Sequence, residues 1–252
     1  MRKILKIVAP IVIALGLCLG CSSDNGSSGN SNGSESLDGK GGSLATFVLK
    51  GDYLYTVDQQ YLNVFSIVNT SNPTKVGGTS VGFNIETLFS FGAYLFVGSM
   101  DALYIYDISF PENPKLLSKA QHFRACDPVV ANATHAYVTL HSNGFCGNTR
   151  NALLIYDITN PSRPVEIATK ELVMPRGLAL YGNYLVVCDD ELKIFDITNP
   201  EDTRFLKSVP HTFKDVVIYK ETLFAFGENR ISQYKWSDAS FTDLELVSTM
   251  VY

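Results

Sequence analysis

Residues 103–111 read Leu-Tyr-Ile-Tyr-Asp-Ile-Ser-Phe-Pro, and the centre of this phrase recurs along the chain. Close copies are Ile-Tyr-Asp-Ile-Thr at Ile155–Thr159 and Ile-Phe-Asp-Ile-Thr at Ile194–Thr198, and weaker copies are at Val64–Ile67 and Gln233–Trp236. Their aromatic positions are 41, 50, 39 and 39 residues apart, at Phe65, Tyr106, Tyr156, Phe195 and Tyr234. A period of about 40 residues is typical of the blades of a β-propeller. The recurrence therefore predicts an all-β fold built from repeats.

Each repeat divides into four short β-like segments. In the fourth repeat they are Gly177–Tyr181, Tyr184–Cys188, Leu192–Ile197 and Arg204–Val209. The dipeptide Gly182-Asn183 is a tight-turn signal between the first two. The second repeat follows the same order, with Thr87–Phe91, Tyr94–Gly98, Leu103–Ile108 and Lys115–Ala120. This order predicts one four-stranded antiparallel blade for each repeat.

The third strand of each repeat is apolar on both of its faces, as Leu103 and Ile105 on one side and Tyr104 and Tyr106 on the other illustrate. A sheet with one face in water would instead alternate apolar and polar residues. A blade packed between two other blades has both faces covered, so we predict a five-bladed β-propeller over residues 44–252. Its repeats are expected at about 44–82, 83–122, 123–172, 173–210 and 211–252. A β-sandwich is the alternative, although it does not require so regular a period.

The aspartate of the recurring phrase ends a strand in three repeats, at Asp107, Asp157 and Asp196. A carboxylate in this position can accept backbone N–H groups of the turn that follows. Because these aspartates stand one to a blade, we predict that they are turn residues and not metal ligands.

The phrase and the residues before it resemble a known repeat. The pattern Leu-x-Ile-Tyr-Asp-Ile-x-x-Pro, preceded by Tyr-Leu-Phe-Val (94–97) or Tyr-Leu-Val-Val (184–187), is similar to the LVIVD repeat. That family occurs in bacterial and archaeal surface proteins and is taken to form propellers. The resemblance covers Leu44–Tyr252, strongly in three repeats and weakly in the first and the last. It implies a propeller at the cell envelope, and it brings no agreed catalytic residues.

The first twenty residues have the pattern of an export signal. Arg2, Lys3 and Lys6 precede the apolar run Ile7–Leu19, whose 13 residues are fewer than the roughly 20 that span a bilayer. Residues 17–21, Leu-Cys-Leu-Gly-Cys, resemble the lipobox of bacterial lipoproteins, in which the final cysteine is lipidated. An ordinary secretory signal with an incidental cysteine is the alternative.

The resemblance to a lipobox implies a signal peptide over residues 1–20 and lipidation of Cys21. A stretch rich in Ser, Gly and Asn follows at 21–43 and predicts a flexible tether. We therefore expect the membrane as a partner and the bacterial envelope as the location, anchored at the outer membrane on its periplasmic or its surface side.

Composition and motifs exclude several classes of function. The chain has a formal net charge of −5, and removal of the first twenty residues, with three bases and no acid, lowers it to −8. This balance disfavours nucleic acid, which requires a basic surface. The sequence contains no Gly-rich phosphate loop, zinc-ligand spacing or Gly-x-Ser-x-Gly motif, so neither a cofactor nor a metal is predicted.

The third repeat is longer than the others, and its extra residues fall at His141–Asn151, between the second and third strands. In a propeller this connection lies on the same face as the segment leading into each blade, and we call this face the insertion face. Cys126 lies in such a leading segment and Cys146 in the insertion. Because an exported protein can meet oxidising conditions, we predict a Cys126–Cys146 disulfide, with two free thiols as the alternative.

One set of polar residues on the insertion face forms a candidate site. When the repeats are aligned on their second strands, Ala45, Glu86, Asp127, Arg176 and Lys214 share one column at the mouth of the central channel. His141, Arg124 and Asp190 would flank it. The column is either a ring of ion pairs that closes the channel or a pocket for a polar ligand, and the sequence leaves both open.

These observations favour a lipid-anchored binding or scaffold module that contacts an envelope protein or polysaccharide through its insertion face. The alternative is a hydrolase or lyase with its site at the channel mouth, although no set of residues shows a recognisable catalytic spacing. A third possibility is a purely structural spacer.

Overall fold

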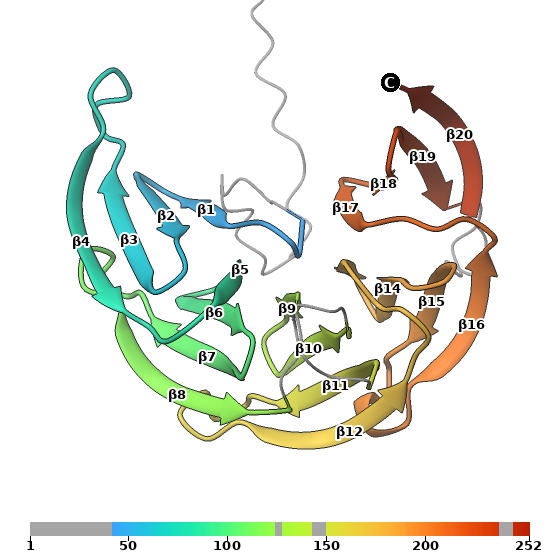
Figure 1. The fold of residues 1–252 in the computed structure, drawn as a ribbon, viewed down its shortest axis with the longest axis horizontal. Coiled ribbons are helices and arrows are strands. Elements are labelled where there is room, and N and C mark those ends of the chain that lie inside the picture. The colour runs from blue at the N-terminus through green and yellow to red at the C-terminus, as the bar shows by residue number, and fades with distance from the viewer. Residues whose placement is uncertain (1–41, 124–127, 143–149, 237–243) are drawn as a thin grey trace, which may run out of the picture. The chain divides into compact units, whose positions relative to one another are not determined.

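The computed structural model describes residues 42–123, 128–142, 150–236 and 244–252. These residues form five sheets, and each sheet consists of four antiparallel strands in chain order (Figure 1). Blade 1 comprises β1 Phe47–Lys50, β2 Tyr53–Val57, β3 Tyr61–Ser66 and β4 Thr74–Ser80. Blade 2 comprises β5 Ile85–Phe91, β6 Tyr94–Ser99, β7 Ala102–Asp107 and β8 Lys115–Gln121.

The remaining three blades repeat this arrangement. Blade 3 comprises β9 Val129–Ala131, β10 His135–Leu140, β11 Ala152–Asp157 and β12 Val165–Glu171. Blade 4 comprises β13 Leu178–Tyr181, β14 Tyr184–Cys188, β15 Leu192–Asp196 and β16 Arg204–Val209, with a 3-10 turn η1 at Pro200–Asp202. Blade 5 comprises β17 Asp215–Tyr219, β18 Thr222–Phe226, β19 Arg230–Trp236 and β20 Leu244–Val251.

The strand bounds predicted for the second and fourth repeats are confirmed to within two residues. The turn at Gly182-Asn183 joins β13 to β14, and Gly182 has a φ of +55°. This left-handed conformation is accessible to glycine without a steric penalty, which explains the turn signal in the sequence. Lys220 takes the same conformation, with a φ of +55°, in the corresponding turn of blade 5.

Buried apolar side chains lie between consecutive blades. Four core clusters occur, and they join blade 1 to blade 2, blade 2 to blade 3, blade 3 to blade 4 and blade 4 to blade 5. The third strands β7 and β11 are buried at five of their six residues, as their apolar pattern predicted. A β-sandwich would have one core between two sheets, so this succession of interfaces identifies a five-bladed β-propeller.

The first strand of each blade lies innermost (Figure 1). Contacts between innermost strands run in chain order from β1 through β5, β9 and β13 to β17. The segment before β1 contacts blade 5, because the Ser43 hydroxyl donates a hydrogen bond to Asp215 Oδ1 over 3.1 Å.

The aspartates of the recurring phrase end their strands as predicted. Asp107 accepts a hydrogen bond from the Ser109 N–H over 2.8 Å, and Asp157 and Asp196 accept the equivalent bonds from Thr159 and Thr198. Hydrogen bonds from the side chain and backbone of Ser109 lower the pKa of Asp107. The carboxylates therefore serve as turn residues.

The expected signal peptide, Cys21 and nearly all of the expected tether lie outside the described residues. The last two residues assigned to the tether, Gly42 and Ser43, belong instead to the folded part, and Ser43 is only 1% exposed. In the part of the chain that the structure describes, no helix has the length and hydropathy to cross a bilayer.

Candidate functional site

The strand ladders place two residues of the predicted column, Arg176 and Lys214, in the same register. The Arg176 N–H donates to the Cys188 carbonyl, and the Lys214 N–H donates to the Phe226 carbonyl, each over 2.7 Å at the same position of its blade. Adjacent blades are joined at this level, since the Gly177 N–H donates to the Lys214 carbonyl over 3.0 Å. The backbones of Arg176 and Lys214 therefore lie side by side on neighbouring blades.

Among the described residues of the column, no ion pair joins one side chain to another. Lys214 Nζ lies 3.5 Å from Glu228 Oε1 of its own blade, and both side chains are well exposed. Glu86 lies at an irregularity of the β5–β6 pairing and is half-buried. Arg176 has no carboxylate within ion-pair distance among the described residues. Asp127, like Arg124, lies outside the described residues, so the column remains a candidate, as an ion-pair ring or as a ligand pocket.

A carboxylate that sequence reasoning missed lies one residue further along blade 5. Asp215, the first residue of β17, is half-buried, and it accepts hydrogen bonds from the Ser43 hydroxyl, the Leu44 N–H and its neighbour Val216 N–H. Burial raises the pKa of Asp215, although these hydrogen bonds oppose the rise. A Cβ on Gly177 would come within 2.1 Å of its carboxylate, so glycine is required there. The sequence did contain a signal for Asp215. It is the one charged residue at a position where the other blades have Thr46, Thr87, Pro128 and Gly177.

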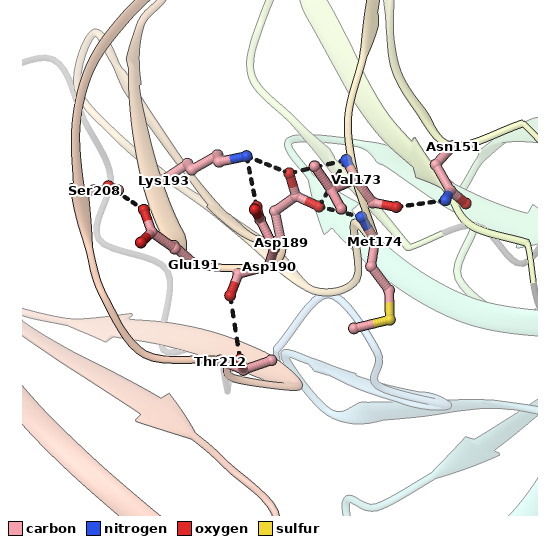
Figure 2. A network of polar contacts seen from close by, with 9 residues as sticks. All are labelled: Asn151, Val173, Met174, Asp189, Asp190, Glu191, Lys193, Ser208 and Thr212. Carbon is pink, nitrogen blue, oxygen red and sulfur yellow. Dashed lines mark hydrogen bonds and ion pairs between the residues drawn. The ribbon is translucent and has the colours of Figure 1, made fainter.

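A second carboxylate organises the polar network shown in Figure 2. Asp189 is fully buried between β14 and β15, and it accepts hydrogen bonds from the backbone N–H groups of Val173 and Met174. Lys193 Nζ lies 2.7 Å from Asp189 and 2.6 Å from Asp190. Blade 4 thus holds the segment by which the chain enters it.

The charges of this network stabilise one another. Burial lowers the pKa of Lys193, but hydrogen bonds and charge from Asp189 and Asp190 outweigh burial and raise it. The hydrogen bond from Lys193 lowers the pKa of Asp190. Asp190, which sequence analysis placed at the flank of the site, is therefore part of a structural ion pair, with its side chain 45% exposed.

The base of the insertion is joined to the same network. The insertion lies between β10 and β11, as predicted, and Asn151 Oδ1 accepts hydrogen bonds from the Ser142 N–H and hydroxyl over 2.7 and 3.0 Å. Asn151 Nδ2 in turn donates to the Val173 carbonyl over 2.5 Å. His141 is half-buried at the start of the insertion. Cys126 and Cys146 lie outside the described residues, so their disulfide remains a prediction.

Cys188 is a free cysteine, and its side chain is fully buried. Burial raises the pKa of its thiol, and the nearby Asp215 charge adds to the rise. A protonated, enclosed thiol is unreactive and packs as a small apolar side chain.

Comparison of the sequence with protein families agrees with the recurring phrase and the strand order. The LVIVD repeat model matches four segments, at residues 41–79, 90–121, 134–169 and 174–209. The chain belongs to the LVIVD repeat family. The first repeat is matched although its resemblance was judged weak, and the fifth lies outside the matched segments.

Solved structures similar to this LVIVD-repeat protein support the propeller fold. The periplasmic gluconolactonase PpgL of Pseudomonas aeruginosa has a TM-score of 0.62 and 15% identity, covering 80% of this chain and 68% of that one. A structure of the mitotic checkpoint complex has a TM-score of 0.60 and 14% identity, covering 80% and 64%. The designed protein Ika8 has a TM-score of 0.58 and 8% identity, covering 81% and 60%. No curated protein matches the sequence.

Proposed function

We propose that this LVIVD-repeat propeller is a lipid-anchored binding or scaffold module of the bacterial envelope, and that it contacts a protein or polysaccharide through its insertion face. The observation that carries the proposal is the fixed base of the insertion. Asn151 joins the two ends of the insertion, through Ser142, to the Val173 carbonyl of the next blade. Loops that carry recognition residues are commonly held in this way on a rigid scaffold.

The alternative of a hydrolase or lyase receives less support from the described residues. Asp189 and Asp190 pair with Lys193, and Asp215 accepts hydrogen bonds from Ser43 and Leu44, so these carboxylates hold the fold together. The likeness to a gluconolactonase, at 15% identity, carries over the fold and not the activity.

The binding proposal is tested by replacing residues 143–149 with a Gly-Ser segment of equal length. The unchanged chain should bind purified envelope polysaccharides or be photocrosslinked to envelope proteins in cells. The loop-replaced chain should lose this binding. The matched control is Phe110→Ser, because Phe110 is 81% exposed on a connection between a third and a fourth strand, which lies on the opposite face. Equal binding by the loop-replaced chain would contradict the proposal.

The anchor is tested separately at Cys21. Full-length chain should partition into detergent, and Cys21→Ala should release it from the membrane or leave it unprocessed. Mass spectrometry of the mature N-terminus is decisive, because an unmodified first residue contradicts lipid anchoring.

A further inference from the structure

Two apolar side chains on the insertion face are exposed although their backbone is tightly held. Val173 is 58% exposed and Met174 is 37% exposed, in the segment that leads from β12 into β13. Figure 2 shows the Met174 side chain extending away from the polar network that binds its backbone. Single exposed apolar residues are common on proteins, so exposure alone says little.

The backbone from Val173 to Arg176 is held by hydrogen bonds at both of its ends. Asp189 accepts from the N–H groups of Val173 and Met174, and Asn151 donates to the Val173 carbonyl. The Arg176 N–H donates to Cys188, and the Arg176 carbonyl accepts from the Thr139 hydroxyl over 2.5 Å. A loop this constrained loses little conformational entropy when a partner binds.

The guanidinium of Arg176 lies beside the Met174 side chain. Arg176 Nη2 is 3.8 Å from Met174 Sδ, and within the described ranges no carboxylate lies within ion-pair distance of the guanidinium. An arginine with unused donors can grip an incoming carboxylate through two parallel hydrogen bonds. Methionine and arginine are also enriched in protein interfaces.

We propose that Val173, Met174 and Arg176 form a docking surface for a polypeptide segment that presents an apolar side chain next to a carboxylate. The proposal rests on the proposed function and names the residues and the partner class. The apolar side chain would cover Val173 and Met174, and the carboxylate would pair with Arg176. A polypeptide fits better than a polysaccharide, because sugar rings pack on flat aromatic faces and this surface offers an aliphatic group and a thioether.

The test uses phage-displayed random twelve-residue peptides selected on the full-length chain, followed by synthetic versions of the peptides enriched. The enriched peptides should carry Asp or Glu beside an aliphatic residue. Met174→Ser and Arg176→Gln should each weaken their binding by about tenfold or more, whereas Phe110→Ser should leave it unchanged. Replacing the peptide's Asp or Glu by Asn or Gln should have the same effect as Arg176→Gln. Thermal melts check that each substitution leaves the fold intact.

Other outcomes overturn the inference and separate it from the proposed function. The inference is contradicted if the enriched peptides lack Asp and Glu, or if no peptide is enriched. It is also contradicted if the peptides bind both variants with affinities within about twofold of that for the unchanged chain. If binding survives both substitutions but is lost when residues 143–149 are replaced, the proposed function stands and this surface is wrong. If neither the two substitutions nor the replacement of residues 143–149 weakens binding, both the docking surface and the proposed function are wrong. Arg176-dependent binding of an acidic oligosaccharide, without any peptide binding, assigns the surface to the other partner class.

Discussion

Two buried tyrosines at equivalent positions differ in whether the hydroxyl group forms a hydrogen bond. Tyr55 and Tyr137 are each the third residue of the second strand of a blade, and both side chains are at most 1% exposed. The Tyr55 hydroxyl donates to the Pro111 carbonyl of the next blade over 3.1 Å. The Tyr137 hydroxyl has no hydrogen-bond partner among the described residues. Burial raises the pKa of both to about 12, so both are protonated at neutral pH.

Replacing each tyrosine by phenylalanine should therefore have different effects. Tyr55→Phe leaves the Pro111 carbonyl without its donor, which should lower the free energy of unfolding by about 1 kcal/mol. Tyr137→Phe removes a buried polar group that lacks a partner, so it should be neutral or stabilise by up to about 1 kcal/mol. Urea unfolding of both variants measures the difference, and equal destabilisation would contradict the assignment.

The raised pKa of Asp215 predicts a dependence of stability on pH. Because burial raises this pKa, the folded protein holds the proton more tightly than the unfolded chain does. Stability from this group is present below the unfolded pKa of about 3.9, and it is lost as pH rises through the higher folded pKa. The unfolding free energy of the unchanged protein should fall, relative to Asp215→Asn, as pH rises through this window.

The control for this prediction has the opposite sign. Hydrogen bonds from Ser109 lower the pKa of Asp107, so its contribution is present above the unfolded pKa and lost as pH falls through the folded one. Relative to Asp107→Asn, the unchanged protein should lose stability on acidification. Denaturant titrations at a series of pH values measure both, and a common sign for the two would refute the argument.

At the scale of elements, the connection from β12 to β13 takes its conformation from the next blade. Asp189, in the turn between β14 and β15, binds the backbone of Val173 and Met174, and Lys193 compensates its charge. The side chains of Asp189 and Lys193 are 0% and 17% exposed. An ion pair this deeply buried is costly to break from one side, because the remaining charge is left in a poorly solvated place.

Lys193→Met should therefore lower the free energy of unfolding by about 3 kcal/mol or more, since it leaves the Asp189 carboxylate buried without a cation. Lys214→Met is the matched control, because its partner Glu228 is 85% exposed, and it should cost at most about 1 kcal/mol. Thermal and urea unfolding measure both variants. If Lys214→Met proves as damaging as Lys193→Met, the channel mouth is a structural ring and not a ligand site.

At the scale of the whole molecule, the two terminal blades differ from the three between them. The second strands of blades 2, 3 and 4 are buried along all but their first residue, whereas β2 is buried only at its third residue and β18 only at its second and fourth. Blades 1 and 5 thus each have one face that no other described blade covers. Ser43 joins the start of the folded chain to blades 4 and 5, because its hydroxyl accepts from the Leu178 N–H over 2.7 Å and donates to Asp215.

Ser43→Ala should consequently destabilise the propeller, although Ser43 is the last residue of the Ser-, Gly- and Asn-rich stretch that was predicted to be a tether. The substitution removes the partner of the buried Leu178 N–H, and leaving such a group unsatisfied costs about 2 kcal/mol. Ser71→Ala, at an exposed serine, is the control and should be within about 0.5 kcal/mol of the unchanged protein. Urea unfolding compares them, and equal midpoints would show that Ser43 does not hold these blades together.

The sequence by itself determined the propeller, the number of blades and, to within two residues, the strand bounds of the second and fourth repeats. Local causes are sufficient here: the Gly182 turn, the strand-ending aspartates and the apolar third strands each act over a few residues and repeat with the blade. The register of Arg176 and Lys214 also followed, because equivalent strands pair in equivalent ways.

Tertiary structure alone decided which polar side chains meet. Ser43 and Asp215 are separated by 172 positions in the chain, and no periodic pattern links two residues that occur only once. Asp190 pairs with Lys193, and Asp189 accepts a hydrogen bond from the backbone of Val173, 16 positions earlier in the chain. Such contacts depend on how neighbouring blades pack, because a hydrogen bond forms only where packing brings donor and acceptor within about 3 Å of each other.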